Sequence, residues 1–353
     1  MRAGEISKTA SMKAKQTSII DIAKALGVSK STVSRALLGH TNVNDETRKA
    51  VLHMSAQLDY QRNTLALGLA RKKTSVVGII VPELQSNFFP SVISGIEEFL
   101  RKNKYRSIIC QSGESYEHEV ESVAQLLSYQ VDGILASHTY ETRNFDHFRQ
   151  VQRKGIPLVM FNRVTDQLNV PKVVVDDYEA AFAMVDFLIQ SGRRRIAHLA
   201  GPDALINSRL RLKGYLDALE KNGVEPDQRL ILSYDLSIEK VKIYVKHFLE
   251  LESPPDAIFC INDPTALAAM LVIKQKNLRI PEDIALAGFS NDFSSDLVTP
   301  TLSTVAQPTS EIGREAAKLL LEEMAASSND SQWQEYPKET MVLKTRLLLR
   351  EST

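Results

Sequence analysis

From Val76 onward, apolar runs of strand length alternate with stretches of helical periodicity. This alternation constrains the fold most, because strands that alternate with helices form parallel sheets covered on both faces. The expected strands form two consecutive sets: VVGIIVP, YRSIICQS, VDGILAS, IPLVMFN and KVVVDD, then RIAHLAG, LILSYD, AIFCIND and DIALAGFS. The expected helices are 89–103, 115–129 and 142–154, then 178–191, 208–222, 238–251 and 264–276. Two such sets predict two doubly wound lobes, with a ligand site beyond the carboxyl ends of the strands, in the cleft between the lobes.

An all-helical region precedes this α/β part. In IIDIAKALGVSKSTVSRALL, from Ile19 to Leu38, apolar residues recur at helical spacing until Gly27 supplies a turn residue that tolerates a left-handed backbone. Ser29 can then cap a second helix. Two short helices joined in this way form a helix-turn-helix, whose second helix lies in the major groove of DNA. The alternative is an ordinary helical hairpin with its polar residues facing water.

The expected inward face of the second helix leaves Lys30, Ser31 and Arg35 pointing outward. Arg35 is the strongest candidate for reading bases, because a guanidinium can donate two parallel hydrogen bonds to guanine. Hydroxyl groups are expected to contact phosphates, which set the register without reading sequence. The candidate DNA contacts in this region are Thr17, Ser29, Lys30, Ser31, Thr32, Ser34, Arg35 and Asn42.

A third helix is expected to begin at a cap on Asn44 or Asp45 and to run to about Leu58. Its inward face would consist of Val51, Met54, Ser55 and Leu58. It completes a small helix-turn-helix DNA-binding headpiece over residues 17–60. Residues 1–16 show no periodicity and are expected to form a disordered arm, so that Met12 is an alternative start.

Charge is unevenly distributed, although the net charge of the chain is zero. Residues 1–73 contain 13 Lys or Arg against 5 Asp or Glu, a balance of +8, and the remainder carries −8. A basic segment gains affinity for DNA by releasing counterions from phosphates, so binding should weaken with salt. A basic solvated tail would explain the charge, but not its coincidence with the helix-turn-helix.

The chain reads as a globular protein of the cytoplasm. No apolar run approaches the roughly 20 residues that span a bilayer, no export signal is evident, and no membrane association is expected. The two cysteines, Cys110 and Cys260, lie in apolar runs. Small buried hydrophobic side chains are therefore expected in preference to a disulfide.

Residues 61–74, the expected hinge helix or linker, follow the headpiece. The stretch YQRNTLALGLARKK, residues 60–73, favours a helix, but an isolated helix of this length is marginal in water. It should form only with a partner; the alternative is a flexible linker.

The runs DIAKALGVSKSTVSRAL, VNDETRKAV and LDYQRN resemble the headpiece of the lactose-repressor and galactose-repressor (LacI/GalR) family of bacterial transcription regulators. The resemblance implies a dimer on a palindromic double-stranded DNA operator, with paired hinge helices in the minor groove and a leucine wedged between base pairs. By position in the motif the groove-facing residues are Asn63, Ala66, Leu69 and Ala70, with Leu69 as the wedge. Two departures weaken this hinge: Arg62 replaces the usual proline, and Gly68 costs about 1 kcal/mol of helix stability relative to alanine.

The resemblance also covers residues 75–353, for which it implies a two-lobed fold like that of periplasmic sugar-binding proteins, with three crossings between the lobes. The helix from Pro308 to about Met324 would return to the first lobe, and a final strand near Glu339 to Leu349 would join the second. The first lobe would then hold about 75–174 and 305–332, and the second about 175–304 and 333–353. No leucine-heptad tail follows Leu349, which favours a dimer over a tetramer held by a terminal coiled coil.

Candidate effector contacts lie at strand ends, where amide, hydroxyl and guanidinium groups could converge over an apolar floor. Arg211 of RLRLKGY and Asn262 of IND match recurring effector contacts of the family, although Arg211 could instead pair on the surface. Asp263 precedes a proline, so a helix cap is expected there, and for Asn291 with Asp292 the alternative is a simple turn. Ser290 and Asn162 stand where relatives carry aspartates. The full set is Phe88, Phe89, Ser137, Phe161, Asn162, Asn207, Arg211, Asn262 and Ser290.

The sequence shows no catalytic motif. His118-Glu119 lacks the second histidine of a zinc-protease helix, and neither a phosphate-binding glycine loop nor a GxSxG elbow is present. No catalytic residue, metal or cofactor is expected. The sequence predicts a ligand-responsive DNA-binding regulator, most simply a repressor with a sugar or small-metabolite effector. The alternative is a stand-alone cytoplasmic solute-binding or sugar-binding protein.

Overall fold

The computed structural model describes residues 17–60, 73–327 and 339–353. The chain divides into two compact units, Met1–Lys72 and Lys73–Thr353. The expected N-terminal arm and the hinge contacts Asn63, Ala66, Leu69 and Ala70 lie outside the described residues.

The first unit contains three helices, α1 (Ile19–Leu26), α2 (Lys30–Leu37) and α3 (Asp45–Gln57). Their common core is built on Ile22, Val33 and Val51, which are fully buried. Each helix begins at a residue whose side chain accepts a backbone N–H: Ser18, Ser29 and Asn44. Gly27 ends α1 in the left-handed conformation at φ 64°, as the expected turn requires.

One expectation for α3 is wrong. Leu58, placed on the inward face, is the residue that ends the helix, and its exposed fraction is 36%. Val51 therefore supplies the fully buried contact of α3, and Met54 is partly buried against the same core.

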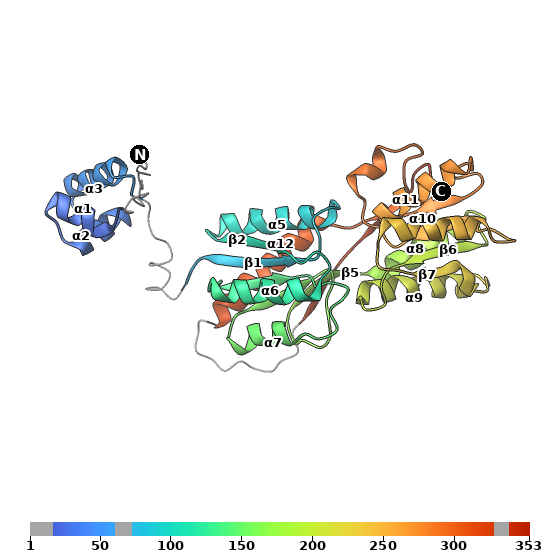
Figure 1. Cartoon of the computed structure of the whole chain (residues 1–353), viewed down its shortest axis with the longest axis horizontal. Coiled ribbons are helices and arrows are strands. Elements are labelled where there is room, and N and C mark those ends of the chain that lie inside the picture. The colour runs from blue at the N-terminus through green and yellow to red at the C-terminus, as the bar shows by residue number, and fades with distance from the viewer. Residues whose placement is uncertain (1–16, 61–72, 328–338) are drawn as a thin grey trace, which may run out of the picture. The chain divides into compact units, whose positions relative to one another are not determined.

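The first lobe of the second unit is a six-stranded sheet in the order β11-β5-β4-β3-β1-β2, with all pairs parallel. Its strands are β1 (Val76–Val81), β2 (Arg106–Gln111), β3 (Gly133–Ala136), β4 (Leu158–Phe161), β5 (Lys172–Val175) and β11 (Thr340–Leu343). Its helices are α5 (Phe88–Lys102), α6 (Tyr116–Ser128), α7 (Asp146–Arg153) and α12 (Thr309–Ser327) (Figure 1).

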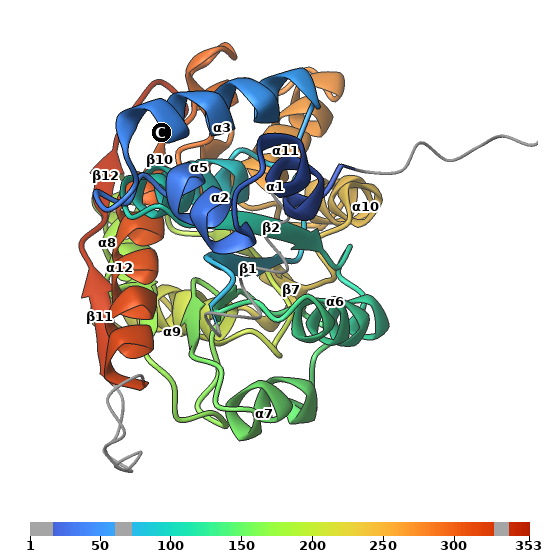
Figure 2. The same cartoon turned by 90° about the vertical axis from the view of Figure 1, so that its left-hand side faces the viewer.

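Alternate residues of β1 face opposite layers of this lobe. Ile79 packs in a core with α5 and α12, whereas Ile80 packs with α6 and α7 on the other face (Figure 2). Helices α5 and α12 approach closely through Gly95 and Gly313. A Cβ atom at either glycine would overlap the backbone of the other helix.

The second lobe has a four-stranded sheet in the order β7-β6-β8-β9, again parallel. A short antiparallel pair, β10 and β12, adjoins β9 through the bridges Ala287–Ser303 and Ser290–Ala306. The strands are β6 (Ile196–Ala200), β7 (Ile231–Ser233), β8 (Ala257–Cys260), β9 (Ala285–Ala287), β10 (Thr304–Ala306) and β12 (Arg346–Leu348). The helices are α8 (Asp177–Gln190), α9 (Ile206–Lys221), α10 (Ile238–Leu249) and α11 (Asp263–Gln275), with short 3-10 turns η1 (Gln228–Leu230) and η2 (Phe293–Asp296).

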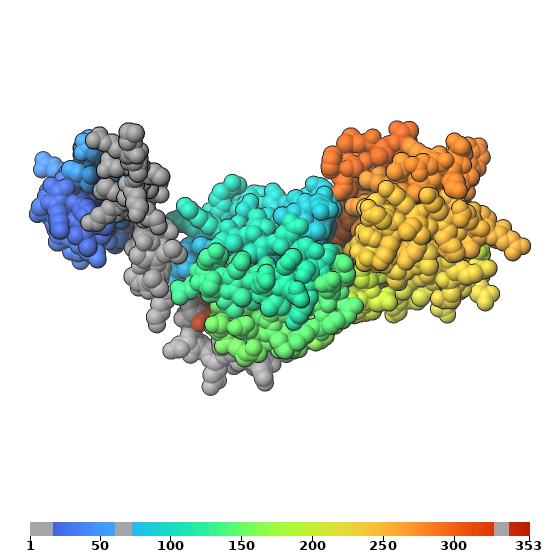
Figure 3. All heavy atoms as spheres, in the orientation of Figure 1, coloured from blue at the N-terminus to red at the C-terminus, as the bar shows by residue number. Residues whose placement is uncertain are grey.

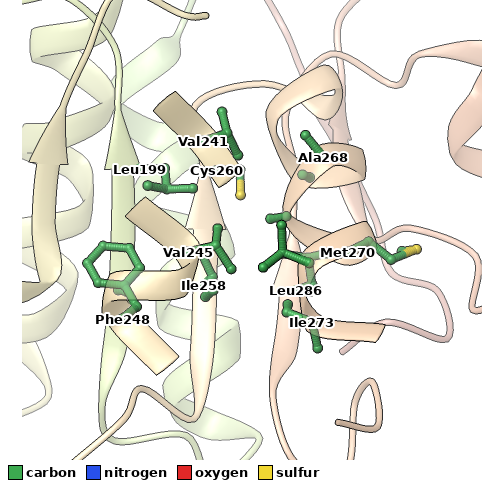
Figure 4. Close-up of a cluster of buried hydrophobic side chains, with 14 of the residues drawn as sticks. Leu199, Val241, Val245, Phe248, Ile258, Cys260, Ala268, Met270, Ile273 and Leu286 are labelled. Carbon is green, nitrogen blue, oxygen red and sulfur yellow. The ribbon is translucent and has the colours of Figure 1, made fainter. Parts of the chain in front are cut away.

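Two cores sandwich this sheet. Side chains of α10 and α11, including Val245 and Ile273, meet those of the strands on one face, and Cys260 lies among them (Figure 4). Helices α8 and α9 cover the other face. Cys260 is a buried free thiol, as expected, and Cys110 is a half-buried one on the edge strand β2.

In the last part of the chain the structure differs from the expected topology. The single strand expected from Glu339 to Leu349 is two strands: β11 pairs with β5 in the first lobe, and β12 pairs with β10 in the second. Thr340–Leu343 therefore belongs to the first lobe, where it satisfies the backbone groups of the outer edge of β5. The chain crosses between the lobes after β5, after β10 and after β11.

The fold class expected from the sequence, a helical headpiece followed by a two-lobed α/β core with parallel sheets, is confirmed. Within the described ranges, the search for a helix with the length and hydrophobicity to cross a membrane found none.

Candidate functional site

Helix α2 exposes the side chains that the sequence analysis singled out for DNA. Lys30, Ser31 and Arg35 are exposed, whereas Val33 and Ala36 are buried against α1 and α3. Among the described residues, no side chain forms a hydrogen bond or an ion pair with Lys30 or with the guanidinium of Arg35. Both cations are therefore available to an external partner.

The start of α2 carries a cluster of hydroxyl groups. The Ser29 Oγ accepts the Thr32 backbone N–H at 3.0 Å and lies 2.7 Å from the Ser31 Oγ and 2.8 Å from the Thr32 Oγ1. Three hydroxyls beside the positive end of a helix dipole suit a phosphate oxygen. Ser29 is thus both the cap of α2 and part of this cluster.

The remaining candidate DNA contacts have different surroundings. The Thr17 hydroxyl donates to the Leu58 carbonyl oxygen at 2.9 Å, which ties the start of α1 to the end of α3. Ser34 is partly buried, and Asn42 is exposed in the turn before α3.

A polar pocket lies between the two lobes of the core. It has an empty volume of about 840 Å³, including its open mouth. The lobes form distinct masses that abut in the space-filling view (Figure 3). The lining residues are Glu83, Ser86, Asn87, Phe88, Phe89, Asn162, Arg163, Leu205, Asn207, Ser208, Arg211, Leu236, Ile261, Asn262, Pro264, Ser290, Asn291, Asp292, Gln307 and Thr309.

The pocket brings together most of the candidate effector contacts, namely Phe88, Phe89, Asn162, Asn207, Arg211, Asn262 and Ser290. Ser137 and Phe161 are not among its lining residues. Phe161 is fully buried in the core of the first lobe, because it ends β4 on the inward face, and its ring centroid lies 6.5 Å from that of Phe89. The buried Ser137 Oγ accepts the Arg163 backbone N–H at 3.4 Å, so it supports the wall from behind.

Arg211 projects from α9 into the floor of the pocket and is held on three sides. Its Nε and Nη2 donate to the Asp177 Oδ1 at 2.8 and 2.7 Å, and its Nη1 donates to the Ile261 carbonyl oxygen at 2.5 Å. Its guanidinium carbon lies 3.5 Å from the centroid of the Phe289 ring. Arg211 is therefore not the surface ion pair that was considered as an alternative.

The partner of Arg211 was not anticipated from the sequence. Asp177 is the last residue of the expected strand KVVVDD, and an acid at the end of a buried strand was the available signal. Burial raises the pKa of Asp177 above its usual value, whereas the neighbouring Arg211 acts in the opposite direction.

The expected helix cap at Asp263 is wrong by one residue. Asn262 caps α11, with its Oδ1 accepting the Thr265 N–H at 2.9 Å and the Thr265 hydroxyl at 2.6 Å. This cap uses only the Oδ1 atom and does not engage the Asn262 Nδ2 group. Asp263 instead occupies the first helical position and is buried.

Asp263 organises the loop after β9. Its Oδ2 accepts the Asp292 N–H and the Ser295 hydroxyl, both at 2.7 Å, and its Oδ1 accepts the Thr304 hydroxyl at 2.6 Å. Burial raises its pKa, although each of these hydrogen bonds acts in the opposite direction. The loop that it holds contributes Ser290 and Asn291, which both have positive φ, to the pocket.

Asn291 and Asp292 do more than form a turn. The Asn291 Oδ1 accepts a hydrogen bond from the Arg350 Nη2 at 2.9 Å. Asp292 caps η2, and its Oδ2 also accepts the Asn87 backbone N–H at 3.2 Å, which joins the second lobe to the first.

Gln307 is a pocket residue that sequence reasoning missed. It lies at the crossing between β10 and α12, where no strand end marks it. Its Nε2 donates to the Ser290 Oγ at 3.1 Å, and its buried Oε1 has no hydrogen-bond partner within the described structure. Glu83, Ser86, Asn87, Leu205 and Leu236 were also missed, because they lie in loops.

A search of the described residues found no group of three or more His, Cys, Asp or Glu side chains that could hold a metal ion. The geometry of the pocket is that of a site for reversible binding of a small polar molecule over apolar side chains.

An exposed, capped recognition helix and a two-lobed core with a polar cleft together define a DNA-binding transcription regulator with a ligand-binding core. The chain belongs to the LacI family of bacterial regulatory proteins. The family model of bacterial regulatory proteins, lacI family, matches residues 18–63. The model of periplasmic binding proteins and the sugar-binding domain of the LacI family matches residues 74–341.

Individual relatives agree with this assignment. The chain is 33% identical to catabolite control protein A of Priestia megaterium over 89% of this chain and 94% of that protein. It is 32% identical to the HTH-type transcriptional repressor CytR of Escherichia coli K12, over 94% of this chain and 95% of that protein. Among solved structures, the transcriptional regulator CelR–cellobiose complex is similar with a TM-score of 0.72 and 26% identity, over 96% of this chain and 100% of that one.

Proposed function

We propose that the protein is a cytoplasmic repressor that binds a palindromic operator as a homodimer. A small metabolite bound in its interlobe pocket would change its affinity for the operator. The outward face of α2 carries this proposal, because Arg35 and Lys30 are exposed and have no described partner. In this proposal Arg35 reads bases, and Ser29, Ser31 and Thr32 contact phosphate at the start of α2. Thr17, Ser34 and Asn42 complete the contacts from the headpiece, and Asn63, Ala66, Leu69 and Ala70 complete them from the hinge.

The effector contacts proposed from the pocket are Phe88, Phe89, Asn162, Asn207, Arg211, Asn262 and Ser290. Gln307 is added to this set because it lines the same pocket with an unpaired amide oxygen. A sugar is one candidate class, since the similar structure of CelR is a complex with cellobiose.

Linkage explains how the pocket would control DNA binding. The pocket is lined by residues from both lobes, so an effector that prefers one relative position of the lobes stabilises that position. The hinge joins the core at Lys73, at the start of the first lobe. In the dimer, the distance between the two hinges would therefore depend on the relative position of the lobes. Operator affinity then changes by the ratio of the effector's affinities for the two states.

We propose no catalytic role for the pocket. Its two arginines are engaged in ion pairs, and its lining contains neither a cysteine nor a histidine.

Genomic footprinting with the purified chain tests the proposal. At low salt the protein should protect discrete palindromic sites, and Arg35→Ala should lose that protection. Lys49→Ala, which removes an exposed cation from α3, serves as the matched control and should retain it. Protection of no site by the parent protein, with or without added metabolites, would overturn the regulator assignment.

A further inference from the structure

We infer that the interlobe pocket selects an uncharged ligand that carries both hydrogen-bond donors and acceptors, and that it excludes phosphorylated and carboxylate metabolites. The inference rests on the proposed function, since it concerns the effector of the same site. Neutral sugars and nucleosides share the required chemistry.

Both cations of the pocket lining are already paired with carboxylates of the protein. The Arg163 Nη1 donates to both oxygens of Glu114, at 2.8 and 2.9 Å, and its side chain is 8% exposed. Arg211 is paired with Asp177, also within the protein. An anionic ligand would have to displace a carboxylate from one of these arginines or share it, and either choice leaves a buried negative charge with less compensation.

The remaining charges of the pocket lining are negative. Glu83 and Asp292 are the other charged residues of the lining, and both are acidic. Glu83 accepts the Gln85 N–H and the Ser86 N–H and hydroxyl, whereas Asp292 accepts the Asn87 and Ser294 N–H groups. Neither lysine nor histidine occurs among the lining residues. With the partners of the two arginines included, four carboxylates face two guanidiniums, so the surroundings repel an anion.

The N-termini of two helices favour an anionic ligand and so oppose the effect of these carboxylates. Helices α5 and α9 begin at the pocket without a side-chain cap, so their first N–H groups can donate to ligand oxygens. The carboxylate of Asp292 lies at the first of these starts, where it accepts the Asn87 N–H at 3.2 Å. An uncharged hydroxyl or carbonyl oxygen can use the remaining donors without meeting the repulsion that a phosphate would meet.

Each carboxamide has one donor and one acceptor group, although the oxygens of Asn207, Asn262 and Asn291 already accept hydrogen bonds within the protein. Six of them line the pocket: Asn87, Asn162, Asn207, Asn262, Asn291 and Gln307. Gln307 is 7% exposed, and its Oε1 has no partner in the described structure. A buried acceptor without a partner can take a hydrogen bond from a ligand hydroxyl or amide, which an ionised phosphate or carboxylate group cannot supply at that position.

The apolar lining fits the same class of ligand. Phe88, Leu205, Leu236 and Ile261 provide carbon surfaces on which a sugar ring or a base can pack. A ring with hydroxyl or amide groups at its edge would therefore satisfy both parts of the wall.

Isothermal titration of the full chain with matched pairs tests this inference. The pairs are glucose and glucose 6-phosphate, ribose and ribose 5-phosphate, and uridine and adenosine with their 5′-monophosphates. At least one uncharged member should bind, and it should bind about tenfold more tightly than its phosphate ester or better. A phosphate ester that binds more tightly than its parent overturns the inference, as does a panel in which no uncharged compound binds.

A pair of variants adds a test that does not depend on the best ligand. Glu114→Gln removes the partner of Arg163, so the affinity of the pocket for phosphate esters should rise by about tenfold. Glu121→Gln, at an exposed position of α6, which begins two residues after Glu114, is the control and should leave this affinity unchanged. No rise in Glu114→Gln would show that the ion pair does not exclude anions. Operator binding by the free protein, measured on the same samples, separates failure of this inference from failure of the regulator assignment.

Discussion

The Arg211 Nε donates to the Asp177 Oδ1 at 2.8 Å, and both side chains are at least 95% buried. This ion pair links α8 to α9 beneath the pocket and fixes the guanidinium over Phe289. Arg211 therefore has a structural role as well as the proposed role in effector contact, and the two roles need different variants.

Arg211→Ala should leave Asp177 as an uncompensated buried charge and lower the free energy of unfolding of the core by about 3–5 kcal/mol. Asp177→Asn combined with Arg211→Met removes both charges and should recover a large part of this loss. Urea denaturation of the three proteins measures both values. A double variant that is no more stable than Arg211→Ala would show that the pair is not coupled.

The same double variant tests the effector site. It should bind operator DNA like the parent protein but lose the response of operator affinity to effector, because the guanidinium no longer lines the pocket. An unchanged response in a folded double variant would contradict the proposed contact.

Arg35→Ala should reduce the discrimination between operator and scrambled DNA by about 1–3 kcal/mol, the value of a bidentate contact with a base. Arg35→Ala should weaken binding to scrambled DNA only slightly, and by about as much as Lys49→Ala does. Fluorescence anisotropy at two salt concentrations measures both effects. If Arg35→Ala and the parent protein discriminate equally between operator and scrambled DNA, Arg35 contacts phosphates and does not read bases.

Leu69→Ser should reduce the bending of operator DNA while leaving effector binding intact, if Leu69 is the proposed wedge. Circular permutation of the operator fragment measures the bend. The parent bend angle in the variant would exclude the wedge.

His198 makes the core sensitive to acid. It is fully buried between the rings of Tyr215 and Phe259, and burial lowers its pKa to about 4. The unfolded chain binds this proton at a pKa of about 6.5, so the contribution of His198 to stability is present above that value and is lost as pH falls through the window from about 6.5 to 4.

Between pH 7 and about 4.5 this group alone should cost the parent protein about 2 kcal/mol of unfolding free energy. His198→Phe keeps an aromatic ring in the stack and removes the titration, so its stability should fall by about 2 kcal/mol less over the same interval. Urea denaturation at the two pH values gives the comparison. Parallel losses in both proteins would exclude His198 as the source.

Leu297→Asp should convert the proposed dimer to monomers. Leu297 and Phe293 are 74% and 64% exposed, the highest values among the exposed large hydrophobic side chains of the described segments, and they lie together at η2. Such side chains suit a contact with a second copy. Ile243→Asp, at a 61% exposed position on α10, is the control and should remain dimeric in sedimentation velocity. Dissociation in the control alone would move the interface to α10.

Local pattern was enough to predict most elements of the core. The helix expected over 115–129 is Tyr116–Ser128, and the strand VVGIIVP contains β1. The period and the length of the apolar pattern are enough to identify such elements without information on long-range contacts. The helix expected over 142–154 begins only at Asp146. Glu119, which is buried, accepts the Thr139 N–H and the Thr142 hydroxyl, so a tertiary contact holds the preceding residues out of the helix.

The pocket likewise combines residues that local pattern could place with residues that it could not. Asn162 and Asn262 could be placed because they follow strands whose carboxyl ends meet at one edge. Gln307 could not, because it reaches the pocket from a lobe crossing. Asp177 and Asp263 could not be given their partners, because Arg211 and Thr304 are brought to them by the packing of other elements.

Sedimentation velocity of the full chain with a labelled duplex from a footprinted site tests the central claim most directly. The account predicts a complex of two 39.4 kDa chains on one duplex, with a population that changes when effector is added. Complexes of one chain per duplex at every protein concentration, unaffected by any compound that binds the pocket, would contradict it.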